Sequence, residues 1–433
     1  MATTTREYQV PYGRRTLRFT LPPGMEGEVL TTPSAPALAD LAAAVRQALA
    51  QPVAGPRLRD LARPGQRVTI VVTDSTRLCP DDVLVPALLE ELQAAGVRPA
   101  DVTVVIGIGL HRPSTPEEKR AMLGTVVDQV RVVDPRPQDP AWLVDLGTTS
   151  NGVPAVVSRL VAEADLVVAT GVVEPHQYAG WSGGRKTVAI GAGSEATIAA
   201  THGPAMLDHP RVRLAVLEGN PFHQAVTEIA ERAGLRFIIN VVLNEDDAVT
   251  AVMAGAPRET FARLVETAAR LYTVPLAGQA DIAIAGVGYP KDSNLYHASR
   301  AATYLYFAPV PVVRPGGVVI IPAEAPEGAG QGVGEQRFRD LMRAYASPAA
   351  LVAAARQHGY PPGGQRAYML ARVLEEWTVI IVGAADPQVV RDLKLVPART
   401  MEEALAIAAE RVGHRARVVV IPHALRTLPV VRV

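Results

Sequence analysis

Eight short apolar runs, spread over most of the chain, constrain the fold more than any other feature. They are RVTIVVTD (67–74), DVTVVIGIG (101–109), ADLVVATG (164–171), RFIINVVLN (236–244), ADIAIAGVG (280–288), GGVVIIPA (316–323), WTVIIVGA (377–384) and RARVVVIP (415–422). Continuous β-branched runs bounded by Gly and Pro are typical of strands buried on both faces of a parallel sheet. Helical patterns separate them, over 80–97, 258–273, 335–346 and 400–413. This alternation predicts an α/β protein with largely parallel sheets flanked by helices.

The length of the chain and one break in its pattern indicate how these elements are divided. A chain of 433 residues is long for one hydrophobic core and fits two domains of about 150–250 residues. The stretch TVPLAGQAD (273–281) follows a helical pattern and precedes a new apolar run, as a domain boundary does. We expect an N-terminal α/β domain over 1–275 and a smaller C-terminal one over 276–433, with the active site in the crevice between them.

Composition excludes several classes of function. The 43 basic and 43 acidic residues balance, so no overall field favours nucleic acid or an anionic membrane. The single cysteine, Cys79, excludes an internal disulfide and a cysteine-rich metal centre. No apolar run approaches the ~20 residues that span a bilayer, and the N-terminus does not resemble a secretory signal. We expect a cytoplasmic protein that acts on a small molecule.

Polar or titratable residues follow several of the apolar runs, where each predicted strand ends. They are Asp74 to Arg77, His111 and Arg112, Glu174 to His176, Gly288 to Asp292, and Glu324. In open α/β sheets, ligands bind in the crevice outside the carboxyl ends of the strands. These five sets therefore predict a single site on which their side chains converge.

His111 and His176 are the candidates for acid and base chemistry. Each follows an apolar run within a few residues and has Gly or Pro nearby. The ordinary pKa of histidine, about 6.5, allows it to accept or donate a proton at neutral pH. The alternative, which the sequence leaves open, is that each histidine caps a strand by hydrogen-bonding the backbone.

Lys186 is the candidate nucleophile. Of the 43 basic residues, only Lys119, Lys186, Lys291 and Lys394 are lysines. A desolvated lysine can lose its proton and become a nucleophilic amine, whereas arginine stays charged. Gly183 and Gly184 precede it, and glycines let a backbone approach a ligand closely. The spacing is not that of the G-x-x-x-x-G-K-[ST] phosphate loop, so a phosphate-binding lysine, a surface lysine and a Schiff-base lysine of a pyridoxal enzyme remain open.

Four further residues are candidates for ligand and metal binding. Asp74 and Arg77, in DSTR, and Arg300, in LYHASR, come where an anionic ligand could bind, because arginine pairs in two-pronged fashion with carboxylate or phosphate. His202 lies 16 residues beyond Lys186 (202 − 186 = 16). No paired spacing of the H-E-x-x-H kind accompanies it, so a metal site built from protein ligands alone has little support.

Six segments, taken in order, resemble the nickel-pincer lactate racemase family. They are DSTR (74–77), GIGLHR (107–112), GVVEPHQYAGWSGGRK (171–186), the region of His202, GNPFH (219–223) and GYPKDSNLY (288–296). The resemblance covers at least residues 67–325, and EPHxxAGxSGGRK is its most specific part. It implies an isomerase, a racemase or epimerase of a 2-hydroxy acid, that works by proton-coupled hydride transfer.

The resemblance also implies a covalently attached cofactor. In this family, a nicotinate-derived mononucleotide with thioamide and thiocarboxylate groups holds nickel through two sulfurs and a ring carbon. Lys186 would be its attachment point and His202 the fourth nickel ligand, a donor set that suits square-planar nickel. The nucleotide would contact Asp74, Arg77, Gly183 and Gly184. The enzymes of pincer synthesis would be partners, since they load the cofactor.

The remaining roles concern the substrate. His111 and His176 would exchange the hydroxyl proton on opposite sides of the substrate. The substrate would contact Arg77, Tyr296, His297 and Arg300. Lactate racemase itself is expected to have glutamine and lysine where this chain has His297 and Arg300, so the resemblance implies a 2-hydroxy acid without specifying lactate. A different class also remains open, namely a non-catalytic protein that binds the pincer or a phosphorylated metabolite.

Overall fold

A computed structural model describes residues 6–432. Residues 1–5 and Val433, the outer ends of the domains predicted at 1–275 and 276–433, lie outside the described residues. The chain divides into unit 1 (Met1–Pro33, Gly203–Ala205 and Tyr272–Val433) and unit 2 (Ser34–His202 and Met206–Leu271). Over residues 6–432, none of the helices has the length and apolar character needed to cross a membrane.

The sheet of unit 2 contains four of the predicted strands. Its six strands have the order β13-β12-β9-β4-β5-β6, and all neighbours are parallel except β12 and β13. They are β4 (Val68–Thr73), β5 (Val102–Gly107), β6 (Arg131–Val133), β9 (Leu166–Val172), β12 (Leu235–Leu243) and β13 (Val249–Gly255). The chain runs outward from β4 to β5 and β6 and returns on the other side with β9. The point where the strand order reverses, at which such sheets bind ligands, is therefore between β4 and β9.

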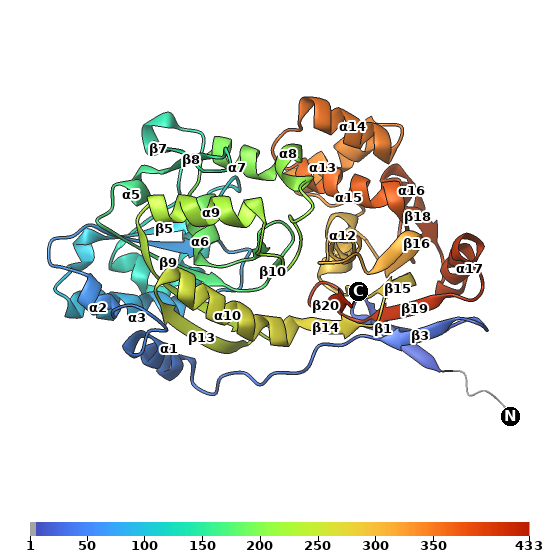
Figure 1. Ribbon diagram of the computed structural model, residues 1–433, viewed down its shortest axis with the longest axis horizontal. Coiled ribbons are helices and arrows are strands. Elements are labelled where there is room, and N and C mark those ends of the chain that lie inside the picture. The colour runs from blue at the N-terminus through green and yellow to red at the C-terminus, as the bar shows by residue number, and fades with distance from the viewer. Residues whose placement is uncertain (1–5, 433) are drawn as a thin grey trace. The chain divides into compact units, whose positions relative to one another are not determined.

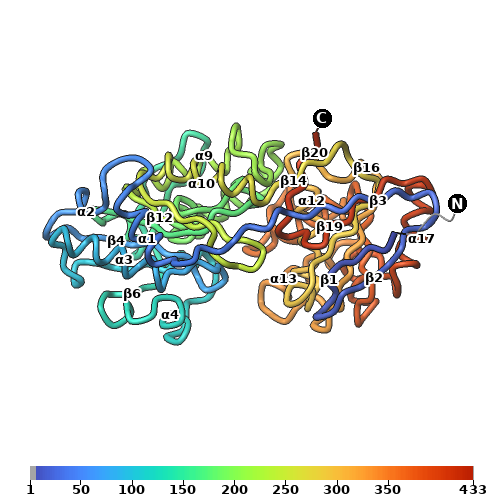
Figure 2. Tube along the Cα trace, turned by 90° about the horizontal axis from the view of Figure 1, so that it is seen from below, coloured from blue at the N-terminus to red at the C-terminus, as the bar shows by residue number. Residues whose placement is uncertain are grey.

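Helices cover this sheet. One face packs against α1 (Leu41–Ala50), α2 (Leu58–Leu61), α3 (Asp81–Ala94) and α4 (Pro116–Leu123), and α1 to α3 lie side by side (Figures 1 and 2). The opposite face is equally buried, as Val71 and Val105 show. The other elements up to Tyr272 are η1 (Pro99–Asp101), η2 (Gly124–Asp128), η3 (Pro140–Trp142), β7 (Leu143–Thr148), β8 (Pro154–Ser158), α5 (Arg159–Ala162), β10 (Pro175–His176), β11 (Gly180–Trp181), α6 (Gly184–Lys186), η4 (Thr187–Gly191), α7 (Glu195–His202), α8 (Pro204–Leu207), α9 (Pro221–Arg232) and α10 (Pro257–Tyr272).

The sheet of unit 1 contains the other four predicted strands. It has six strands in the order β18-β17-β16-β15-β19-β3, and every neighbouring pair is parallel. They are β3 (Glu26–Val29), β15 (Ala280–Ala285), β16 (Val313–Pro322), β17 (Thr378–Val382), β18 (Val396–Ala398) and β19 (Arg417–Ile421). The other elements of unit 1 are β1 (Glu7–Tyr12), β2 (Arg15–Thr20), β14 (Thr273–Leu276), η5 (Lys291–Ser293), α11 (Leu295–Ala298), α12 (Arg300–Tyr306), α13 (Val333–Ala344), α14 (Pro348–His358), α15 (Gln365–Glu376), α16 (Pro387–Asp392), α17 (Met401–Val412) and β20 (Leu428–Val431). The prediction of an α/β fold with two largely parallel sheets is confirmed.

The first strands belong to the unit that the C-terminal residues form, which differs from the predicted N-terminal domain at 1–275. β3 pairs in parallel with β19, beside which it lies in Figure 2. Tyr8, Val10 and Phe19 pack in the same hydrophobic core as β15 and β16. The physical reason is that β3, with the sequence EGEV, has too few apolar residues to read as a strand by itself. Its place depends on backbone pairing with the edge of β19.

The turn between β1 and β2 contacts the segments that follow β15 and β16. The backbone N–H of Gly13 donates to Oδ2 of Asp292 at 2.5 Å, and Arg15 forms an ion pair with Glu324. A Cβ on Gly13 would lie 2.2 Å from the Glu324 carboxylate, so the turn requires glycine. Of the five polar sets, 288–292 and Glu324 lie in unit 1, where Asp292 and Glu324 bond to the chain's own hairpin. The convergence of all five sets on one site stays a prediction.

Candidate active site

Two loops of unit 2 meet at the reversal point of its sheet. Arg77 follows β4 and Glu174 follows β9, and their side chains form an ion pair with 3.6 Å between Nη1 and Oε1. Both side chains are about two-fifths exposed, at 40% and 39%. The sequence predicts a site after these strands, and the structure brings the two loops together there.

Asp74 and His111 form a hydrogen-bonded pair between the loops after β4 and β5. Nδ1 of His111 lies 2.5 Å from Oδ2 of Asp74, and the other Asp74 oxygen accepts from the hydroxyl and backbone N–H of Thr76. Burial of Asp74 acts to raise its pKa, but the hydrogen bonds from His111 and Thr76 outweigh it, so the pKa is lowered. Asp74 is therefore a carboxylate that orients the His111 ring.

His176 lies on a small hairpin directly after β9. β10 and β11 pair antiparallel, with His176 opposite Gly180. Nδ1 of His176 accepts hydrogen bonds from the backbone N–H groups of Tyr178, at 3.2 Å, and Ala179, at 3.1 Å. Gly180 has φ +75°, and a Cβ there would lie 2.2 Å from the carbonyl oxygen of Val216, so this hairpin also requires glycine.

The turn that carries Lys186 is held down by tight packing on the sheet. Cβ atoms on Gly183 and Gly184 would lie 3.1 Å from Asn240 and Ala169 respectively, and Gly183 has φ +141°. The next side chain, Arg185, is buried with its guanidinium 3.5 Å from the Phe261 ring centroid. The sequence interpretation assigns these glycines to a close approach by a ligand, and the structure shows that the sheet itself also packs closely against both.

The environment of Lys186 favours a neutral amine. Burial, and then the positive charge of Arg77, lower its pKa to about 7, although Asp74 and Glu174 act in the opposite direction. A lysine held near this pKa is nucleophilic at neutral pH. The electrostatic coupling places Lys186 among the same residues that surround His111.

His202 is held in one tautomer. Its Nδ1 lies 3.0 Å from the carbonyl oxygen of Ile198, and since a carbonyl only accepts, Nδ1 carries the hydrogen and Nε2 the lone pair. Burial, and then the charge of Lys186, lower the pKa of His202 to about 4, although the bond to Ile198 acts the other way. A neutral imidazole whose Nδ1–H is fixed by a carbonyl is the usual state of a metal-ligating histidine.

Two aromatic rings, those of Tyr178 and Phe222, lie between His176 and His202 and contact both. Tyr178 packs edge-on against both His176 and His202, with ring centroids 5.6 and 5.4 Å away. Phe222 contacts the same three rings, at 6.2, 6.1 and 5.2 Å from His176, Tyr178 and His202. Unit 2 thus gathers the predicted residues Asp74, Arg77, His111, His176, Lys186 and His202 into one neighbourhood.

The remaining predicted residues, Tyr296, His297 and Arg300, belong to unit 1. Arg300 donates to the hydroxyl of Tyr304 at 3.0 Å. Nε2 of His297 lies 3.3 Å from Oε1 of Glu335, and burial, with nearby Lys291 and Arg300, lowers the pKa of His297 to about 4. His297 is therefore a neutral ring and not a second cation beside Arg300.

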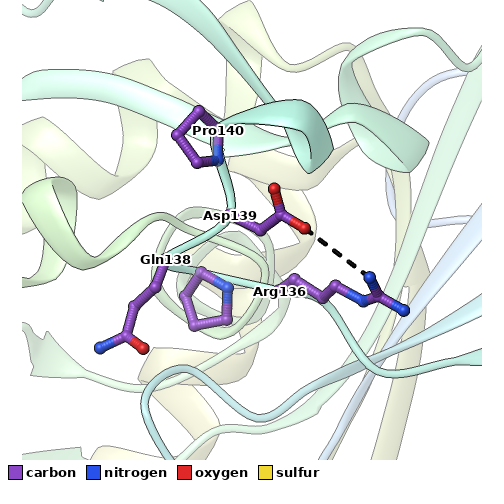
Figure 3. Close-up of a pocket in the computed structure, with 5 residues that line it drawn as sticks. Arg136, Gln138, Asp139 and Pro140 are labelled. Atoms are coloured by element: carbon purple, nitrogen blue, oxygen red, sulfur yellow. Dashed lines mark ion pairs between the residues drawn. The ribbon is translucent and has the colours of Figure 1, made fainter.

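An open surface hollow of about 470 Å³ lies elsewhere on unit 2 (Figure 3). Its lining consists of Arg136, Pro137, Gln138, Asp139 and Pro140. Arg136 and Asp139 pair with each other at 3.7 Å, as the dashed line shows. None of the predicted site residues lines it.

Several residues of the site carried no role in the sequence interpretation. Glu174, Tyr178 and Phe222 all lie inside the motifs quoted from the sequence, and that position is the signal by which they could have been identified. Ser182 ties the glycine turn to the end of β9, because its hydroxyl donates to the carbonyl of Val172 at 2.6 Å. His223, which is partly buried, stacks on Phe261. Trp377 is a core residue, edge-on to Tyr306 at 5.0 Å.

Comparisons with known proteins agree over nearly the whole chain. A family profile described as the lactate racemase N-terminal domain matches residues 12–215, and one described as the lactate racemase C-terminal domain matches residues 276–428. The chain is 32% identical over 422 residues to the lactate racemase of Thermoanaerobacterium thermosaccharolyticum, which covers 96% of this chain and 97% of that protein. It is also 32% identical over 386 residues to the lactate racemase of Lactiplantibacillus plantarum, covering 88% and 89%.

Comparison with solved structures agrees with the comparison of sequences. The lactate racemase apoprotein from T. thermosaccharolyticum superimposes with a TM-score of 0.86 at 30% identity, over 98% of this chain and 100% of that one. A protein from Thermotoga maritima shares the fold with a TM-score of 0.62 at 19% identity, over 87% and 96% of the two chains. The chain therefore belongs to the lactate racemase family and is an isomerase of the racemase type.

Proposed function

We propose that this racemase inverts C2 of a 2-hydroxy acid, using a nickel-pincer nucleotide joined to Lys186. The observation that carries the proposal is the pairing of a lysine whose pKa is lowered to about 7 with a neutral His202 of fixed tautomer. The first provides an amine for covalent attachment, and the second provides one nitrogen ligand. Its relatives are named lactate racemases, which supports a 2-hydroxy acid as the substrate class. A cytoplasmic location, with the pincer-synthesis enzymes as partners, remains part of the proposal.

The residues present fit such a group. Within residues 6–432, no three His, Cys, Asp or Glu side chains gather into a metal site, so the chain supplies few donors of its own. A cofactor that brings most of its metal donors and needs one imidazole matches that donor set. Lys186 would hold it covalently, His202 would ligate nickel, and Arg77, Gly183 and Gly184 would contact the nucleotide. When bound, the group supplies an acceptor for the hydride that leaves C2.

The side chains of the chain itself handle the proton and the carboxylate. Nε2 of His111 accepts the hydroxyl proton, and the Asp74 carboxylate stabilises the imidazolium that results. Both oxygens of Asp74 are bonded within the chain, which supports a role in orienting His111 in place of a contact with the nucleotide. His176 serves the hydroxyl on the other side of the substrate. For the substrate carboxylate we propose Arg77, Tyr296, His297 and Arg300.

The proposal is tested by mass spectrometry and by a racemisation assay. We expect protein made with nickel and the pincer-synthesis enzymes to carry an added mass on the Lys186 peptide and to racemise one member of a panel of short, aromatic, dicarboxylic and sugar-derived 2-hydroxy acids. Lys186→Arg should abolish both results, whereas Lys394→Arg should change neither. An unmodified Lys186 in an active wild-type protein would refute the attachment.

A further test separates catalysis from binding. His111→Ala and His176→Ala should each reduce racemisation by at least 10²–10⁴-fold, the usual contribution of a positioned acid or base, while nickel stays bound. His414→Ala, at an exposed position, is the matched control. A loaded wild-type protein that exchanges no C2 hydrogen with any acid of the panel would be a carrier of the cofactor and not a racemase.

A further inference from the structure

The two histidines of the proposed acid–base pair are held by opposite kinds of hydrogen-bond partner. On His176, Nδ1 faces two backbone N–H groups, those of Tyr178 at 3.2 Å and Ala179 at 3.1 Å. A backbone N–H can only donate, so Nδ1 must present its lone pair to both. A neutral imidazole has one hydrogen, which on His176 must therefore be on Nε2.

On His111, the partner of Nδ1 is a carboxylate. Oδ2 of Asp74 lies 2.5 Å from Nδ1, and the lowered pKa of Asp74 keeps it ionised at neutral pH. A carboxylate can only accept, so Nδ1 carries the hydrogen. Nε2 of neutral His111 therefore carries a lone pair, the reverse of the arrangement on His176.

The local chain explains why His176 receives two N–H groups. The β10–β11 hairpin pairs His176 with Gly180 across a short turn, and this turn directs the N–H groups of residues 178 and 179 back onto the ring. Protonating Nδ1 would place its hydrogen against both donors, so the imidazolium form of His176 is disfavoured in this conformation. A histidine whose ring nitrogen accepts backbone N–H groups and which acts as a neutral donor is known from triosephosphate isomerase.

We infer that the neutral rings of His111 and His176 are held in opposite tautomers, so that Nε2 of His111 presents a proton acceptor and Nε2 of His176 a proton donor, with the backbone N–H groups of Tyr178 and Ala179 as positioning groups for His176. The catalytic meaning of this assignment rests on the function proposed above, whereas the tautomers themselves do not. The pair then offers one base and one acid at once, without a change in the total number of bound protons.

The protons balance over one turnover. The hydroxyl proton of the substrate moves to Nε2 of His111, which becomes an imidazolium beside Asp74. The hydrogen on Nε2 of His176 moves to the C2 oxygen of the product, and its bonding electrons remain on the ring, where the two backbone N–H groups stabilise the negative charge. One proton then passes from His111 through solvent to His176 and restores the resting state, and the other enantiomer reacts through the same steps in reverse.

Nitrogen-15 NMR of apoprotein labelled at histidine tests the assignment without any activity. Ring nitrogen shifts distinguish a protonated nitrogen from one with a lone pair, and His176→Gln and His111→Gln identify the signals by their loss. We expect hydrogen on Nε2 of His176 and on Nδ1 of His111. Hydrogen on Nδ1 of His176, alone or together with Nε2, at neutral pH would overturn the inference.

Two variants test the cause of each tautomer. Asp74→Asn gives His111 an amide that can donate, so its hydrogen should move to Nε2 and racemisation should fall by about 10⁴-fold, as with the equivalent change in a serine protease triad, while the His176 signals stay in place. Ala179→Pro removes one N–H donor and should raise the fraction of His176 with hydrogen on Nδ1. An unchanged tautomer in folded Ala179→Pro would overturn the positioning role of the Ala179 N–H.

The outcomes separate this inference from the proposed function. Expected tautomers in a loaded protein that racemises nothing would refute the function and leave the tautomer assignment supported. Racemisation by a protein whose His176 carries hydrogen on Nδ1 would support the function and refute only this inference.

Discussion

Arg77 and Glu174 join the loops after β4 and β9 through an ion pair of 3.6 Å, at the point where the strand order of unit 2 reverses. Both charges also act on Lys186, in opposite directions: Arg77 lowers its pKa and Glu174 raises it. The pKa of Lys186 therefore depends on both charges of this ion pair, whose side chains are about two-fifths exposed. Changing one partner should alter the reactivity of Lys186 more than the stability of the fold.

Glu174→Gln should lower the pKa of Lys186 below its wild-type value. Loss of the negative charge removes an influence that favours the ammonium form. The pH profile of Lys186 acylation, followed by peptide mass spectrometry, should shift to lower pH, while stability changes by less than about 1 kcal/mol because the pair is exposed. Glu266→Gln, which breaks an exposed pair with Arg263, is the control. A shift to higher pH would contradict the assigned role of Glu174.

Lys186→Met should stabilise the apoprotein at low pH. The folded pKa of Lys186 is about 7, against 10.5 for an ordinary lysine. Between these values the unfolded chain binds a proton that the folded chain does not, so wild-type stability rises with pH across this window. Below about pH 7, the folded protein bears the full cost of burying the charged Lys186 ammonium. Lys186→Met should therefore be more stable than wild type by roughly 1–3 kcal/mol after allowance for partial exposure.

Denaturant unfolding of wild type and Lys186→Met at about pH 6 and about pH 10 measures this difference directly. The advantage of the variant should shrink toward the higher pH. An advantage that is constant with pH would show that the effect comes from packing and not from the charge.

His202→Ala should lose nickel and keep the attached nucleotide. If His202 is one of the metal ligands, its removal should lower the nickel content of loaded protein by more than about 10-fold, whereas the added mass on the Lys186 peptide should persist. Metal analysis and mass spectrometry on one sample measure both. His358→Ala, at an exposed position, should leave nickel in place. Full nickel content in His202→Ala would exclude His202 as a ligand.

Gly13→Ala should destabilise unit 1 through the β1–β2 turn. Gly13 has φ +56°, and an added Cβ would meet the Glu324 carboxylate at 2.2 Å. Gly316→Ala is a matched control in the same unit, because Gly316 has φ +78° and open space around it. Backbone strain is common to both, so the additional loss in Gly13→Ala, which we expect to be about 1–3 kcal/mol, measures the clash. Equal losses in denaturant unfolding would show that Glu324 moves away without cost.

Eight of the twelve strands in the two sheets were predictable because burial on two faces leaves a local record, whereas β3, β6, β13 and β18 were not predicted. The run at 164–171 appears as β9 (Leu166–Val172), all of whose residues are buried. β3 left no such record, since its sequence EGEV is mostly exposed. Its position depends on a partner strand near the opposite end of the chain, and pairing over such a distance has no signature in the sequence of either strand.

The candidate site was predictable as a set of residues, but their pairings were not. Periodicity places Asp74 and His111 at the ends of neighbouring strands, yet the hydrogen bond between them depends on loop conformations after β4 and β5. The roles of the glycines show a similar limit. Gly183 and Gly184 indicate a close approach, and the sequence does not reveal that the approaching group is the floor of the sheet.

The pairing of β3 with β19 also has a consequence for the order in which the chain folds during synthesis. Residues 6–33 leave the ribosome long before the strand that they pair with, Arg417–Ile421. At about 5–20 residues per second, they wait tens of seconds for that partner, while unit 2 has all its strands by Gly255. Unit 2 can therefore fold co-translationally, whereas unit 1 cannot complete its sheet until Arg417–Ile421 has been synthesised.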